Sequence, residues 1–88
     1  MRIVAVWRDN TDYAREMTEW IQEFERETHR KVESLDPDTV DGEIFVRARE
    51  IVQYPSIVVV DGRGAVLRMW AGRPLPAFDE VIYCLGEM

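Results

Sequence analysis

Cysteine is almost absent from this 88-residue chain, and the single one, Cys84, excludes an internal disulfide. Long apolar runs are missing too: residues 3–7 and 57–60 fall far short of the ~20 residues that cross a bilayer. The first run begins almost at Met1, which leaves no room for a signal peptide. We therefore expect a cytoplasmic protein with no membrane association, and a lone thiol fits a reducing compartment.

Basic residues are in the minority, since 11 Lys and Arg stand against 17 Asp and Glu and give a net charge of -6. An acidic surface repels phosphate, so we expect neither a nucleic-acid partner nor anionic lipid. The 47% hydrophobic and 32% charged residues are typical of a soluble globular chain. The length predicts one compact domain, residues 1–88, that folds without a metal or a disulfide.

The spacing of apolar residues predicts seven elements in the order βαβαββα. Two helical crossovers predict that the first three strands are parallel, and a Gly-containing turn predicts a final antiparallel hairpin. The predicted fold class is therefore α/β, with a mixed four-stranded sheet and helices on both faces. The predicted strands are 3–7, 32–36, 56–60 and 65–71, and the predicted helices are 12–29, 40–53 and 77–86.

Two segments in the second half of the chain carry a family likeness. They are Tyr54-Pro55-Ser56-Ile57-Val58-Val59-Val60-Asp61-Gly62 and Val66-Leu67-Arg68-Met69-Trp70-Ala71-Gly72. Together with the order of elements, they resemble the thioredoxin and glutaredoxin superfamily over nearly the whole chain. The resemblance implies a thioredoxin-like fold in which Pro55 is cis and faces the site, with Gly72 beside it.

The dithiol chemistry of that superfamily needs a C-x-x-C motif at a helix start, where the helix dipole lowers the thiol pKa. If Trp7 is aligned with the family's tryptophan, Thr11-Asp12-Tyr13-Ala14 stands in place of that motif. Ala5 stands where thioredoxins bury a proton-accepting aspartate. Dithiol–disulfide oxidoreductase activity is therefore excluded, and we expect no catalytic residue and no cofactor. His29 has neither a second histidine nor a cysteine at metal-ligand spacing.

The resemblance leaves a vestigial binding groove, and we call its predicted residues the Pro55 site. The thioredoxin backbone before the cis proline pairs with an extended substrate, so Tyr54 would inherit a form of strand addition that needs no cysteine. This favours a redox-inactive adaptor that binds a protein or peptide partner. The Pro55 site consists of Trp7, Asn10, Thr11, Tyr13, Tyr54, Pro55 and Gly72.

Several alternatives remain open for these residues. Thr11 is either a helix cap or a hydroxyl that polarises glutathione or another small thiol. The aromatic residues Trp7, Tyr13 and Tyr54 suit core packing and a recognition surface equally. Residues 65–71 offer an edge strand for a homo-oligomeric subunit, so we expect a monomer or a weak homodimer. Trp20 and Trp70 are predicted at the core or its edge, and Cys84 as a partly buried apolar residue.

Overall fold

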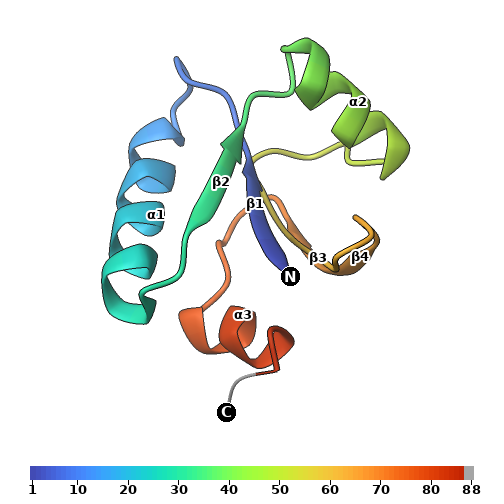
Figure 1. Cartoon of the computed structure of the whole chain (residues 1–88). Coiled ribbons are helices and arrows are strands. Elements are labelled where there is room, and N and C mark those ends of the chain that lie inside the picture. Colours follow the sequence, from blue (N-terminus) through green and yellow to red (C-terminus); the bar gives the residue numbers. More distant parts are fainter. Residues whose placement is uncertain (87–88) are drawn as a thin grey trace.

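The structure, a computed structural model, describes residues 1–86, and residues 87–88 of the predicted domain lie outside this part. Four strands form one sheet in the order β2-β1-β3-β4 (Figure 1). The α/β class, the mixed sheet and the order of elements are confirmed. The elements are β1 (Arg2–Val6), α1 (Ala14–Thr28), β2 (Val32–Leu35), α2 (Val40–Ala48), β3 (Ser56–Val60), β4 (Val66–Ala71) and α3 (Phe78–Cys84).

Strand direction differs from the prediction at one place. β1 is parallel to β2 but antiparallel to β3, so the prediction of three parallel strands is wrong. The reason is the path after α2: residues 49–55 return the chain to the end of the sheet at which α2 begins (Figure 1). Ser56 therefore pairs with Val6, which also pairs with Leu35 at the end of β2. The β3–β4 hairpin is antiparallel, as predicted.

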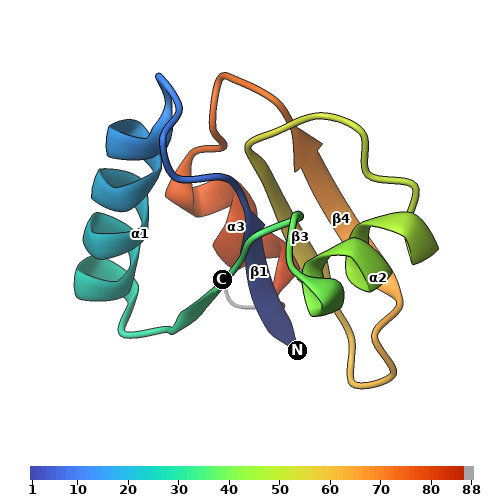
Figure 2. The same ribbon diagram turned by 90° about the horizontal axis from the view of Figure 1, so that it is seen from above.

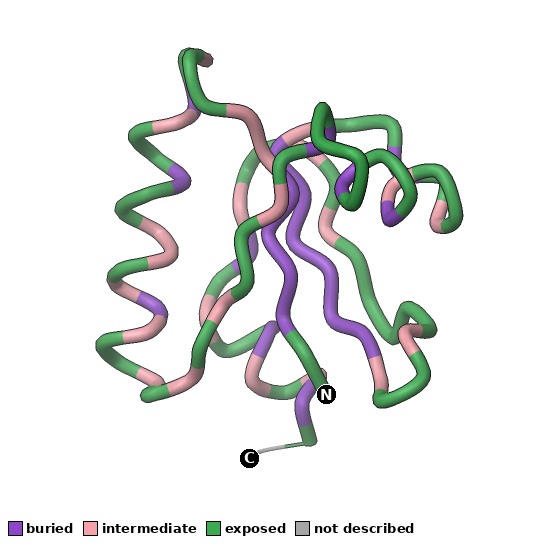
Figure 3. Tube along the Cα trace, turned by 45° about the horizontal axis from the view of Figure 1, so that its top comes forward, coloured by how far each residue is buried: buried purple, intermediate pink, exposed green. Residues whose placement is uncertain are grey.

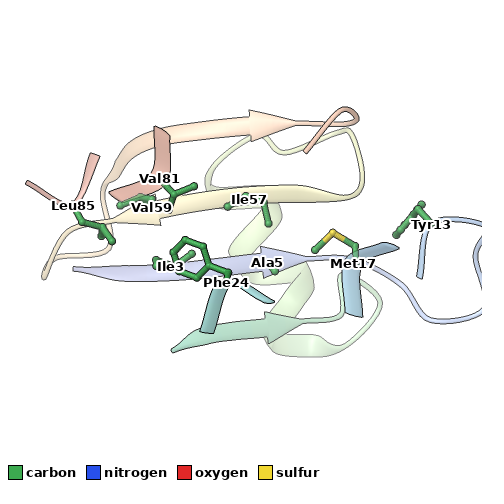
Figure 4. Packing of buried hydrophobic residues seen from close by; sticks show 9 residues of the cluster. All are labelled: Ile3, Ala5, Tyr13, Met17, Phe24, Ile57, Val59, Val81 and Leu85. Atoms are coloured by element: carbon green, nitrogen blue, oxygen red, sulfur yellow. The ribbon is translucent and has the colours of Figure 1, made fainter. Parts of the chain in front are cut away.

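Helices cover both faces of the sheet, with α1 and α3 on one face and α2 on the other (Figure 2). Side chains of successive strand residues point to opposite faces, which divides the buried strands β1 and β3 between two cores. The core of the α1/α3 face holds Ile3, Ala5, Tyr13, Met17, Phe24, Ile57, Val59, Val81 and Leu85 (Figure 4). The core of the α2 face holds Val4, Val6, Phe45, Ile51, Val58 and Val60.

Helix α2 ends at Ala48, before the predicted boundary at residue 53. Glu50 has a φ of 55°, a left-handed conformation that cannot continue a helix. Ile51 is nevertheless buried, and its N–H donates to the Val46 carbonyl at 2.9 Å. Its apolar side chain thus extends the helical spacing beyond the helix itself, which explains the error in the predicted length.

A glycine inside α2 has a steric reason. A Cβ atom added to Gly42 would lie 1.8 Å from the backbone oxygen of Asp36. The helix therefore approaches the loop after β2 more closely than any side chain permits. The Thr39 hydroxyl, which accepts from the Gly42 N–H at 3.0 Å, caps this helix.

The residues predicted at the core edge lie there. Trp20 is half-buried, stacks on Phe24 with 5.0 Å between ring centroids, and donates its indole N–H to the Pro76 carbonyl at 3.0 Å. Trp70 and Cys84 are half-buried as well. Among the helices of residues 1–86, none is both long enough and apolar enough to span a membrane.

β4 lies at the edge of the sheet and is exposed along most of its length (Figure 3). Its register against β3 changes once, because Val59 pairs with Arg68 whereas Val60 pairs with Val66. Leu67 is therefore an extra residue, which makes a β-bulge in β4.

Candidate functional site

The register of the sheet brings the three segments of the predicted Pro55 site to one end of the molecule. Val6, the last residue of β1, pairs with Ser56, the first residue of β3. Ser56 in turn pairs with Ala71, the last residue of β4. The loop after β1, the residues before β3 and Gly72 therefore lie at the same end of the sheet (Figure 1).

Pro55 and Gly72 lie side by side, as the resemblance implied. The Tyr54–Pro55 peptide bond is cis, and the Gly72 N–H donates to the Pro55 carbonyl at 2.8 Å. Gly72 has a φ of 76°, a conformation that favours glycine, and a Cβ there would lie 3.2 Å from Gln53 Oε1. A second cis bond, Arg73–Pro74, follows directly and was not predicted.

Arg8 connects most of the site and is not among the residues predicted from the sequence. Its backbone N–H donates to the Tyr13 hydroxyl at 3.1 Å, and its guanidinium lies 4.7 Å from the centroid of the Tyr54 ring. The same guanidinium donates to both carboxylate oxygens of Asp38, at 2.8 and 3.1 Å. A charged residue directly after the central strand was the available sequence signal.

Thr11 does not cap α1, so that interpretation is wrong. The helix begins at Ala14 rather than at Asp12, and its N-cap residue is Tyr13, which makes no side-chain capping bond. The Thr11 hydroxyl instead donates to the Arg8 carbonyl at 2.9 Å. The hydroxyl proton is thus already used inside the loop, and a ligand thiolate would have to replace the Arg8 carbonyl as its acceptor.

The other predicted site residues differ in their surroundings. Trp7 is half-buried and donates its indole N–H to Ser34 Oγ of β2 at 3.2 Å. Tyr13 is only 8% exposed and belongs to the core of the α1/α3 face (Figure 4). Asn10 is exposed with a φ of 55°, a left-handed turn position that asparagine tolerates.

Arg8 forms an ion pair with Asp38 at this end of the sheet, and Arg73 forms longer ones, at 3.5 Å, with Asp12 and Glu16. Hydrogen bonding from the Arg8 guanidinium lowers the pKa of the Asp38 carboxyl below its ordinary value. The same hydrogen bond raises the pKa of Arg8 further. Since the Arg8 and Asp38 side chains are partly exposed, at 39% and 65%, solvent screens this pair.

The residues present at the site cannot carry dithiol chemistry. The single thiol lies on α3, in the half-buried Cys84. Ala5 is completely buried, and its side chain offers no group that could accept a proton. Within residues 1–86, no three His, Cys, Asp or Glu side chains are grouped so that they could hold a metal ion.

One cleft is lined by none of the residues of the Pro55 site. Its volume is about 610 Å³, and Trp20, Phe78 and Pro74 line it together with Glu16, Glu19 and Glu23 of α1. A smaller cavity of about 160 Å³ does reach the site, because Trp7 lines it next to Ser34 and Leu35 of β2.

The fold and site together define a class: an α/β chain with a cis proline at the start of a strand, a glycine beside it, and no thiol pair. The chain is similar to the structure of thioredoxin 1 from the thermophilic eubacterium Thermosipho africanus TCF52B, with a TM-score of 0.68 and 17% identity. The match covers 98% of this chain and 91% of that chain.

A second solved structure, described as a malarial protein, matches with a TM-score of 0.65 and 10% identity, over 96% of this chain and 91% of that chain. No family model matches the sequence, and no curated protein matches it. The chain therefore has a thioredoxin-like fold without the C-x-x-C motif.

Proposed function

We propose that this chain is a redox-inactive, thioredoxin-like module that binds an extended polypeptide segment at the Pro55 site. The supporting observation concerns the backbone of Tyr54. Within residues 1–86, neither its N–H nor its C=O takes part in a hydrogen bond. An extended segment laid beside Tyr54 would satisfy both groups by strand addition.

The surroundings of Tyr54 support the same proposal. Its ring is half-buried between the two cores and lies under the Arg8 guanidinium, which holds it in place. The Gly72 N–H keeps the loop after β4 bonded to Pro55. A rigid backbone lowers the entropic cost of ordering a bound peptide, which favours affinity.

The test begins with a peptide selected against the chain from a displayed random library. We expect the amide resonances of Tyr54 and Gly72 to shift on titration of the wild-type chain with this peptide. Tyr54→Ala should weaken binding by about tenfold or more, since buried tyrosines often dominate interfaces. Tyr83→Ala is the matched control, because Tyr83 is 67% exposed on α3.

Two results would contradict the proposal. One is a selected peptide whose titration leaves the Tyr54 and Gly72 resonances in place. The other is equal affinity for the Tyr54→Ala chain, provided that this chain still unfolds cooperatively. Titration with glutathione separates the small-thiol alternative, which requires a shift at Thr11; we expect none, because the Thr11 hydroxyl already donates to Arg8.

A further inference from the structure

β4 presents an unpaired strand edge at a place distinct from the Pro55 site. Hydrogen-bonded residues alternate along an antiparallel ladder, and Gly72 bonds to Pro55 on the side of β3. By that alternation, the N–H and C=O groups of Ala71 and Met69 point away from β3. Within residues 1–86, no further strand covers this edge in the sheet order β2-β1-β3-β4.

The β4 edge has few of the features that usually protect an outer strand, and its bulge at Leu67 is the main one. Such strands are kept short or carry several charges, a lysine or a proline. β4 is six residues long, with neither proline nor lysine, and Arg68 is its one charged residue. β2, at the opposite edge, is four residues long and carries Glu33, which pairs with Arg2 at 2.8 Å.

The two faces of β4 differ in chemistry. Met69 pairs with Val58 and Val66 pairs with Val60, so both share the α2 face with those core residues. Alternation from Met69 adds Leu67 to that face, where exposed fractions are 44% for Leu67 and 36% for Met69. Arg68 lies on the other face, with its guanidinium 4.9 Å from the Trp70 ring centroid.

The sequence around β4 is basic, in contrast to the acidic chain as a whole, although one of its arginines, Arg73, pairs with Asp12 and Glu16 at 3.5 Å. Residues 62–78 contain three arginines and no acidic residue, whereas the chain carries -6. The preceding acid, Asp61, accepts hydrogen bonds from the backbone of Arg63 and Ala65 and is thus used by the turn. Arg49 reaches the same hairpin, donating to the Gly64 carbonyl at 2.7 Å.

We propose that the β4 edge binds an extended segment of another protein in which acidic and apolar residues alternate. Its backbone would pair with Met69 and Ala71. One row of its side chains would cover Val66, Leu67 and Met69, and the other row would place a carboxylate opposite Arg68. Opposite charges directly across a strand pair stabilise it, and like charges destabilise it.

A second copy of the chain fits this edge less well. Symmetric pairing centred on Arg68 would set two arginines opposite each other, and two chains of charge -6 repel. Nucleic acid would satisfy the arginines but not the exposed apolar row, nor the outward N–H and C=O groups in strand geometry.

The probe is a labelled peptide, acetyl-Glu-Val-Glu-Val-Glu-Val-Glu-amide, titrated into the wild-type chain. We expect the amides of Met69 and Ala71 to shift and saturate. Arg68→Glu should weaken binding by about tenfold or more, because it sets like charges across the pair. Arg47→Glu is the matched control: Arg47 is an 80% exposed arginine of α2 that pairs with Glu43.

Met69→Pro is a second variant, because it removes an outward N–H without breaking the ladder to β3; it should abolish binding. No binding of the peptide at millimolar concentration would overturn the proposal. So would an equal response to the same peptide with Lys in place of Glu, self-association of the chain through β4, or displacement by a single-stranded oligonucleotide. Tyr54→Ala should leave this binding unchanged, which separates the β4 edge from the Pro55 site.

Discussion

The two faces of the sheet are built unequally. Two helices cover the α1/α3 face, where Trp20 stacks on the buried Phe24 and Phe78 meets both rings edge-on, with centroids 5.0 to 5.4 Å apart. One short helix covers the α2 face, and its core is smaller. Val66, Leu67 and Met69 remain exposed on that side.

This difference separates two properties of the chain: one face of the sheet provides more of the stability, and the other leaves more surface accessible. Burial of apolar area supplies most of the stabilising free energy, so we expect the α1/α3 face to contribute more of it. The α2 face leaves apolar side chains and a strand edge available to other molecules. Four substitutions test this division.

Phe24→Ala should have the largest effect. Phe24 is fully buried between two other rings, and its removal should lower the free energy of unfolding by about 3 to 5 kcal/mol. Urea unfolding measures this loss. Phe45→Ala is the matched change on the α2 face, where Phe45 is 9% exposed; a larger loss there would reverse the comparison.

Gly42→Ala tests how tightly the single helix of the α2 face is held. Alanine favours a helix by about 1 kcal/mol over glycine, yet its Cβ would meet the Asp36 carbonyl. We expect net destabilisation of about 1 to 3 kcal/mol by overpacking. Gly62→Ala is the control, since nothing lies within 4 Å of a Cβ there. Thermal unfolding that shows a more stable Gly42→Ala chain would refute the close approach.

Tyr13→Phe probes the junction between the two faces at the Pro55 site. The hydroxyl of Tyr13 accepts from the Arg8 N–H, and its loss should cost about 1 kcal/mol of folding free energy. The amide of Arg8 should also exchange faster with solvent. Unchanged exchange at Arg8 would mean that this hydrogen bond does not hold the loop.

Asp38→Asn should have the smallest effect, and one that depends on pH. The folded-state pKa of Asp38 is lowered, so the ion pair stabilises the fold above the unfolded value of about 3.9. That contribution is lost as the pH falls through the folded pKa. Urea midpoints of the wild-type and Asp38→Asn chains should therefore differ slightly at pH 7 and converge at acid pH. A difference that grows toward acid pH would contradict the lowered pKa.

Local patterns in the sequence were sufficient for most of the fold. Unbroken β-branched runs located β1 and β3, and the helical spacing of Met17, Trp20 and Phe24 located α1. The cis Pro55 and its contact with Gly72 followed from the family resemblance rather than from the residues alone. The length of α2 was wrong because a buried loop residue, Ile51, continues the apolar spacing.

Features that depend on long-range geometry could not be obtained in this way. The direction of β3 is set by the path of residues 49–55, which carry no local signal for it. The role of Arg8 depends on Asp38, thirty residues away, and on the parallel register of β1 and β2. The helix cap was one of two alternatives for Thr11 because its residue type favours a cap, whereas the loop uses its hydroxyl in a bond to the Arg8 carbonyl.

The bulge in β4 has a consequence for how this chain can vary in length. Val59 pairs with Arg68 and Val60 with Val66, so Leu67 occupies no rung of the ladder. Deleting that one residue would leave both neighbouring pairs intact and turn the bulge into a regular hairpin. The fold can thus lose Leu67 while every strand pair between β3 and β4 is kept. A relative one residue shorter at this point would retain the sheet but lose one of the exposed apolar side chains of β4.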